Sequence, residues 1–96
     1  RLCERSGWPD NQSCIGLLAW QWQMGGERYL VAINYQQSVA QARIHPAWGD
    51  LRGRSWRLAD RLSDASYDRD GAEMADVGLY VDMAPWQFHL FQLIPL

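Results

Sequence analysis

The sequence contains no lysine, and all nine of its basic residues are arginines. Eleven acidic residues bring the formal net charge to -2. Nucleic-acid-binding domains normally carry a basic excess on at least one face, and the arginines here are scattered from Arg1 to Arg69. Long apolar runs are also missing: the longest, from Ile15 to Trp20, has six residues, whereas a membrane-spanning helix needs about 20. The sequence therefore predicts neither a nucleic-acid partner nor a membrane partner.

Cysteine and histidine are equally scarce, which limits the metal chemistry open to the chain. Cys3 and Cys14 lie eleven positions apart, outside any CxxC motif. They permit either one disulfide in an exported protein or two free thiols. His45 and His89 are 44 positions apart, which is far from the spacing of zinc ligands. We expect no metal and no cofactor.

Motifs for catalysis are absent as well. The sequence has no G-x-S-x-G motif and no glycine-rich phosphate loop. The acidic stretch 64–73 can be aligned with a calcium-binding EF-hand loop, but Val77 then stands where a bidentate glutamate is needed. A chain of 96 residues rarely encloses a cleft that holds two catalytic carboxylates around a sugar. We expect no catalytic residues in this chain, which is not predicted to be an enzyme by itself.

The sequence is rich in short segments in which bulky apolar residues alternate with smaller or polar ones, a pattern typical of β-strands. We expect the first three to form an antiparallel meander, and residues 54–62 to form a strand rather than a helix. Glycine, proline and polar residues between the segments indicate turns about every 8–12 residues, the spacing of an all-β sandwich or barrel. The predicted strand segments are 14–22, 27–35, 39–45, 54–62, 79–83 and 86–93.

The alternation also predicts which side chains form the core. We expect the bulky members of each segment to point inward and to be buried in a single antiparallel sandwich. The predicted core residues are Val31, Ile33, Trp56, Leu58, Val81, Trp86, Phe88 and Leu90.

Tryptophan is unusually frequent, with six residues in 96. Trp8 and Trp48 lie in predicted loops, where an indole can remain exposed and stack on a sugar ring. Trp8 is followed by Asp10 and Asn11, and Trp48 has His45, Asp50 and Arg52 close in sequence. Because sugar sites combine a stacking aromatic ring with hydrogen-bonding side chains, Trp8 and Trp48 are the candidate carbohydrate-binding residues.

Three stretches together resemble the C-terminal β-domain of the α-amylase family, glycoside hydrolase family 13. They are YLVAINYQQSVAQARIHP at 29–46, LRGRSWRLADRLSDASYDRDG at 51–71 and GLYVDMAPWQFHLFQL at 78–93. Family members tend to carry an LVVVNLS-like strand, a W-x-L-x-D-x-L strand with a Y-x-R-x-G continuation, and a closing GLYVDLPPWGYHVF-like pair. The order and spacing of the three stretches carry the resemblance, which covers residues 29–93.

The resemblance implies an antiparallel Greek-key β-sandwich of about seven to eight strands over residues 15–96, with residues 1–14 as a linker or N-terminal extension. In the family, hydrolysis or transglycosylation of α-glucans belongs to a (β/α)8 barrel that precedes this domain, so no catalytic carboxylate is carried over. The absence of an initiator Met is in keeping with a domain of a longer bacterial polypeptide. The implied role is non-catalytic: the domain packs against the barrel of the same polypeptide and stabilises it. A cytoplasmic location is favoured.

Two other functions compete with this interpretation. The chain could be a free-standing carbohydrate-binding module that stacks α-glucan on surface tryptophans, or an unrelated sandwich used for protein–protein contact. The reading frame upstream of Arg1 separates the three, since only the first requires a preceding barrel.

Overall fold

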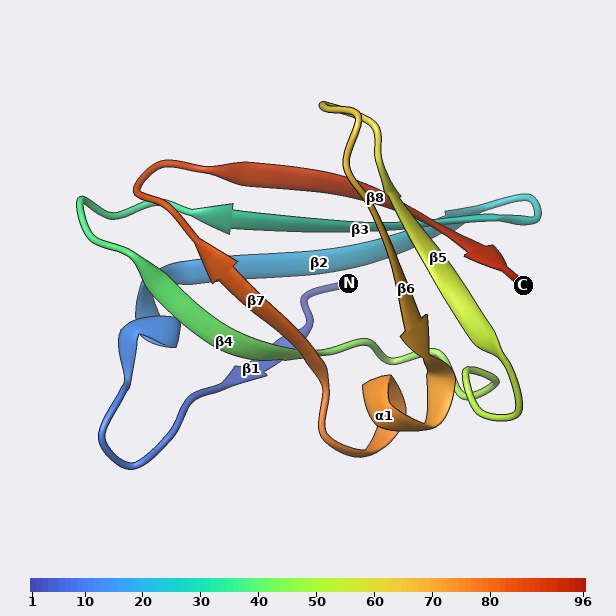
Figure 1. The fold of residues 1–96 in the computed structure, drawn as a ribbon, viewed down its shortest axis with the longest axis horizontal. Helices are drawn as coiled ribbons and strands as arrows, with labels where there is room; N and C mark the ends of the chain where they lie inside the picture. Colours follow the sequence, from blue (N-terminus) through green and yellow to red (C-terminus); the bar gives the residue numbers. More distant parts are fainter.

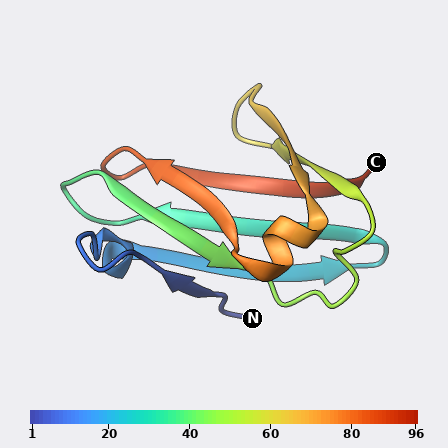
Figure 2. The same ribbon diagram turned by 60° about the horizontal axis from the view of Figure 1, so that its bottom comes forward.

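Eight strands form two antiparallel sheets that pack face to face in the computed structural model, which describes all residues from 1 to 96 (Figure 1). The strands of one sheet cross those of the other at an angle, as both views show (Figures 1 and 2). The all-β sandwich expected from the sequence is therefore confirmed. The strands are β1 (Glu4–Ser6), β2 (Leu17–Met24), β3 (Glu27–Asn34), β4 (Ala40–His45), β5 (Ser55–Asp60), β6 (Ser66–Asp70), β7 (Leu79–Met83) and β8 (Phe88–Pro95), with a 3₁₀ helix η1 (Ser13–Gly16) and a helix α1 (Gly71–Asp76).

The larger sheet has the strand order β2-β3-β8-β5-β6 and the smaller one the order β1-β4-β7. The prediction of a three-strand meander is wrong, because β4 leaves β3 and pairs with β1 and β7 in the other sheet. Asn34 explains this crossover: its buried side-chain amide donates to the carbonyls of Ser38, Met83 and Ala84 at 2.9, 3.2 and 2.9 Å. These bonds tie the β3–β4 loop to the end of β7 and so direct the chain into the smaller sheet.

Residues 54–62 contain a strand, as predicted, since β5 pairs with both β6 and β8. The short helix α1 was not predicted from the sequence, where Gly71 is expected only to turn the chain. The Asp70 carboxylate accepts a hydrogen bond from the Glu73 N–H and caps the helix. Gly71 is required at its position, because a Cβ there would stand 1.7 Å from the Leu51 carbonyl oxygen.

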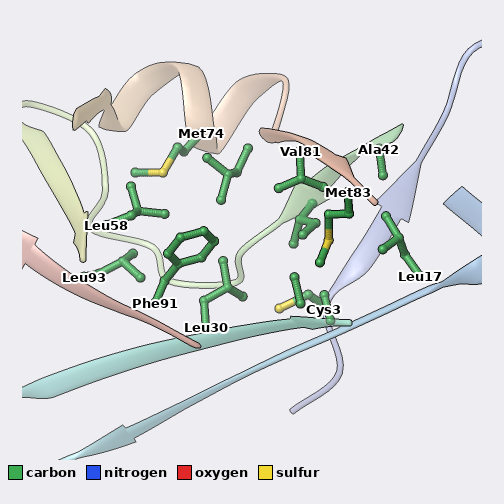
Figure 3. Close-up of a cluster of buried hydrophobic side chains, with 14 of the residues drawn as sticks. Cys3, Leu17, Leu30, Ala42, Leu58, Met74, Val81, Met83, Phe91 and Leu93 are labelled. Atoms are coloured by element: carbon green, nitrogen blue, oxygen red, sulfur yellow. The ribbon is translucent and has the colours of Figure 1, made fainter. Parts of the chain in front are cut away.

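The core lies between the two sheets and under α1 (Figure 3). Its inner faces combine four fully buried alanines with larger aliphatic and aromatic side chains. Alanine permits the two sheets to approach closely. Prominent members are Leu17, Leu30, Ala42, Leu58, Met74, Val81, Met83, Phe91 and Leu93.

The predicted core is only partly correct. Trp56, Leu58 and Val81 are buried, but Val31, Ile33 and Leu90 are half-buried. Trp86 and Phe88 are exposed by 58% and 56%. On β2, β3 and β8, apolar side chains occur on both sides of the strand. The alternation therefore indicates a strand but does not show which side faces the core. On β2 and β3 the buried set contains alanine (Ala19 and Ala32), whereas on β8 it contains Phe91 and Leu93.

The N-terminal segment 1–14 packs on both sheets along one side of the sandwich. Arg1 exchanges two backbone hydrogen bonds with Gln21 of β2, and the Cys3 N–H donates to the Ala19 carbonyl. The next residues form β1 beside β4. Cys3 and Cys14 are both buried and both free, and burial raises the pKa of the Cys3 thiol. Neither helix has the length and apolar character needed to cross a membrane.

Candidate functional site

Trp8 lies at an open surface hollow of about 340 Å³. Asp10 and Asn11, the polar neighbours expected from the sequence, line the hollow together with Gln41 and Tyr80. The Trp8 indole packs edge-on against the Tyr80 ring with 6.0 Å between centroids, and the Asn11 amide donates to Gln41 Oε1 at 2.8 Å. Sequence reasoning missed Gln41 and Tyr80 because β4 and β7 bring them in from distant positions. The hollow offers an aromatic surface beside carboxylate and amide groups.

Trp48 is in a different environment, because it is partly buried against the core. The Arg28 guanidinium lies over the Trp48 ring at 5.5 Å and over the Trp56 ring at 5.1 Å. Arg28 is held there by two hydrogen bonds to the Asp50 carboxylate, of 2.7 and 2.6 Å. The hydrogen bond from Arg28 lowers the pKa of Asp50. One side of the indole is thus covered by a cation that belongs to the protein.

The other polar residues near Trp48 in sequence also have protein partners. Arg52 forms an ion pair with Asp76, and His45 Nε2 lies 2.8 Å from Ser6 Oγ. The loops that carry the two candidate tryptophans, 7–12 and 46–54, lie at opposite ends of the molecule (Figures 1 and 2). The structure therefore gathers the predicted polar partners around Trp8 and engages those around Trp48 in internal contacts.

The most extensive apolar surface lies on the larger sheet, on the side away from the core. We call it the outer face and define it by the outward side chains of β2, β3 and β8. The strand register sets these side chains in rows across the three strands, so they contact one another laterally. In one row, Trp22 and Tyr29 stack with 5.2 Å between centroids. The outer face consists of Leu18, Ile33 and Phe88 in one row, Trp20, Val31 and Leu90 in the next, and Trp22 and Tyr29 beyond them.

Polar side chains border the outer face toward β5 and β6. Arg57 and Asp68 are joined by two hydrogen bonds of 2.9 and 3.2 Å, and the hydrogen bond from Arg57 lowers the pKa of Asp68. Arg61 donates to Gln92 Oε1 at 2.8 Å. An apolar centre with a polar border is the usual anatomy of a protein–protein interface.

Trp86 lies in a strained turn, two residues before Phe88 of the outer face. The Gln87 N–H donates to the Ala84 carbonyl at 3.1 Å, which closes a four-residue turn with Pro85 in its second position. Trp86 follows Pro85 with φ = 61°, the only non-glycine residue with positive φ. This left-handed conformation suits Gly or Asn and is costly for a bulky residue. An exposed indole kept in a strained turn is typical of a contact anchor.

Comparison with known proteins gives no family for the chain: no family model matches it, and a search of curated proteins finds no match. The structure also brings together no group of three or more His, Cys, Asp or Glu side chains that could hold a metal ion. The candidate functional features are therefore the outer face and the Trp8 hollow.

Proposed function

We propose that this chain is the non-catalytic C-terminal β-sandwich domain of an α-amylase-like enzyme acting on α-glucans. In this proposal the outer face packs against the catalytic (β/α)8 barrel of the same polypeptide and stabilises it. The observation that carries the proposal is the outer face itself, where eight apolar or aromatic side chains stand in register without a covering layer.

The position of the resemblance in the fold supports this role. The stretch 29–46 supplies β3 and β4, and 78–93 supplies β7, the Trp86 turn and most of β8. These segments provide inward residues for the core and outward residues for the outer face. Apolar side chains on both sides of a strand are expected where both sides are covered.

The chemistry of the outer face favours a helical layer as the partner. A sheet face buries its apolar side chains most effectively against amphipathic helices, and a (β/α)8 barrel has an outer ring of helices. The outer face includes the exposed aromatic side chain of Phe88, and the exposed indole of Trp86 lies two residues before it. None of the eight apolar or aromatic side chains of the outer face is charged, and Glu27 borders them next to Tyr29. Interfaces of this kind concentrate their binding energy in a few tryptophan, tyrosine and arginine residues.

The first test is the reading frame that precedes Arg1. It should encode a (β/α)8 barrel with the carboxylate motifs of the family. A frame that encodes a different kind of module would overturn the proposal.

The second test uses the full polypeptide. Val31→Glu and Phe88→Glu each place a charge in the outer face without altering the core. We expect both to lower the midpoint of thermal unfolding of the barrel, measured by loss of α-glucan hydrolysis after heating. Val77→Glu, at an exposed position at the end of α1, is the matched control and should leave the midpoint unchanged. Equal midpoints for all three variants would refute the docking role.

A second candidate function is carbohydrate binding at the Trp8 hollow, and it is favoured by the polar side chains that line that hollow. Titration with maltoheptaose, followed through the indole N–H signals, should then shift Trp8 at millimolar sugar, which corresponds to about -4 kcal/mol. Saturable shifts at micromolar sugar would favour a dedicated carbohydrate-binding module. Absence of any shift at millimolar sugar would leave docking as the only function supported.

A further inference from the structure

The sandwich is open on the side where β6 and β7 lie at the edges of their sheets. Neither strand has a hydrogen-bonded neighbour on that side, and a cavity of about 210 Å³ reaches inward between the sheets. Its floor is formed by core side chains, including Leu58, Leu79 and Phe91. We call this cavity the edge cleft. It is smaller than the roughly 300–1,000 Å³ of sites for drug-sized ligands, a size that suits a single small ring.

A buried hydrogen-bonded pair fixes one polar group in the edge cleft. His89, which lines the cleft, has its Nδ1 2.7 Å from Asp60 Oδ2. Asp60 also accepts hydrogen bonds from the Leu62 N–H, the Leu90 N–H and the Ser63 hydroxyl. Burial alone would raise the pKa of Asp60, but these hydrogen bonds, with that from His89 the largest, lower it. The carboxylate is therefore ionised at neutral pH.

The ionised carboxylate determines the state of the His89 ring. Because an ionised carboxylate only accepts hydrogen bonds, Nδ1 must carry the proton. The other ring nitrogen, Nε2, has no hydrogen-bond partner within the protein; it accepts a hydrogen bond when the ring is neutral and donates one when the ring is charged. The ring is also held in place by stacking on Phe91, with 4.9 Å between centroids. His89 thus offers an oriented ring nitrogen, Nε2, that no group of the protein bonds.

The remaining lining groups combine aromatic rings with two unpaired charges. Tyr67 and Tyr80 are exposed by 39% and 40%, and the Arg43 guanidinium lies over the Tyr80 ring at 5.5 Å, so each ring is only partly open to a ligand. Arg69, which lies over the Tyr67 ring at 5.4 Å, and Asp82 both line the cleft. Neither takes part in an ion pair. One positive and one negative group on the same cleft favour a neutral ligand that both donates and accepts hydrogen bonds.

We propose that the edge cleft binds one ring of a neutral carbohydrate, with the apolar side of the sugar ring against the Tyr67 side chain and its hydroxyl groups on His89 Nε2, Arg69 and Asp82. Tyr80 lines both the edge cleft and the Trp8 hollow, and the Gln41 amide of the hollow donates to Asp82 at 3.4 Å. The two sites are therefore adjacent, and consecutive rings of one oligosaccharide occupy them. The proposal rests on the second candidate function, carbohydrate binding, and is separate from barrel docking.

The test is an NMR titration of the chain with maltotriose, with assigned backbone, indole and imidazole signals. We expect saturable shifts in His89, Tyr67 and Arg69 together with those at Trp8. Asp82→Asn and Tyr80→Ala should weaken binding by about fivefold or more, the effect of losing one hydrogen bond or one stacking ring. Their matched controls are Asp64→Asn and Tyr35→Ala, at exposed positions that line neither site, which should bind as the unaltered chain does.

The other outcomes of the titration distinguish failure of the edge-cleft proposal from failure of carbohydrate binding as a whole. Shifts confined to Trp8, Asp10 and Asn11 would overturn the edge cleft while leaving carbohydrate binding in place. Absence of shifts anywhere would overturn both. Binding of an apolar peptide in the cleft, with no response to maltotriose, would show that the ligand is a protein side chain rather than a sugar. The Asp82, Asp64 and Tyr35 variants should keep the thermal midpoint of the unaltered chain, because these side chains are exposed.

Discussion

Phe88 and Phe91 lie three residues apart on β8 and point to opposite sides of the larger sheet. Phe91 is 3% exposed and Phe88 is 56% exposed. The same substitution at the two positions therefore tests which side of the sheet is the core. We expect Phe91→Ala to be strongly destabilising and Phe88→Ala to be nearly neutral in this chain.

The magnitudes follow from burial. Truncating a buried phenylalanine to alanine costs about 3–5 kcal/mol, because transfer free energy is lost and a cavity remains. Phe91 also loses its contacts with the rings of His89 and Tyr67. Phe88 has less than half of its surface covered, so its truncation should cost about 1 kcal/mol or less. Since small domains have a total stability of about 5–15 kcal/mol, Phe91→Ala could unfold the chain outright.

Urea unfolding followed by tryptophan fluorescence measures the difference. With a slope of about 1.5 kcal/mol per molar urea, the expected loss for Phe91→Ala lowers the midpoint by about 2–3 M. The midpoint for Phe88→Ala should fall by well under 1 M, a change similar in size to that caused by other surface substitutions. A Phe88→Ala midpoint as low as that of Phe91→Ala would show that the two faces have been assigned the wrong way round.

Other positions give predictions of the same kind. Gly71→Ala should destabilise the chain by about 3 kcal/mol, since its Cβ would meet the Leu51 carbonyl; an unchanged thermal midpoint would contradict the close approach. Asn34→Ala should cost about 1–3 kcal/mol in urea unfolding, because three carbonyls lose their donor. Because the pKa of Asp60 is lowered in the folded chain, the unfolded chain binds more protons as acid is added. The stability that Asp60 contributes is therefore present above its ordinary pKa near 3.8 and is lost as the pH falls below that value. Asp60→Asn should flatten that acid dependence, and an unaltered slope would argue against the ionised pair with His89. Trp86→Gly should stabilise the chain by up to about 1 kcal/mol by relieving the left-handed turn, yet weaken docking of the barrel; a loss of stability would show that the indole packs on this chain.

The sequence identified most of the strands because alternation is a local property that each strand displays by itself. It failed for the faces of β3 and β8, where residues such as Val31 and Ala32 are both apolar and only the opposite sheet decides between them. The helix α1 had a detectable signal in Asp70 followed three residues later by Glu73, the pattern of a capping interaction. Its six residues are too few for a helical period to emerge.

In the candidate sites too, contacts between sequence neighbours could be predicted, whereas contacts between distant parts of the chain could not. The grouping of Trp8 with Asp10 and Asn11 is local and could be predicted. The contributions of Tyr80 to the hollow and of Asp60 to His89 depend on strand pairing between distant parts of the chain. No single stretch of sequence contains them.

The contact of residues 1–3 with β2 has a consequence for association between copies of the chain. β2 is the outermost strand of its sheet on that side, it has eight residues, LLAWQWQM, and none of them is charged. A long uncharged strand edge is a template for pairing with another chain. Arg1 and Cys3 form hydrogen bonds with the backbone groups of Gln21 and Ala19, so they cover part of this edge. At the opposite side β6 needs no such cover, because Asp68, Arg69 and Asp70 discourage strand addition by charge. Displacing the N-terminal residues would therefore leave β2 with an uncharged, unpaired edge that could pair with β2 of a second copy.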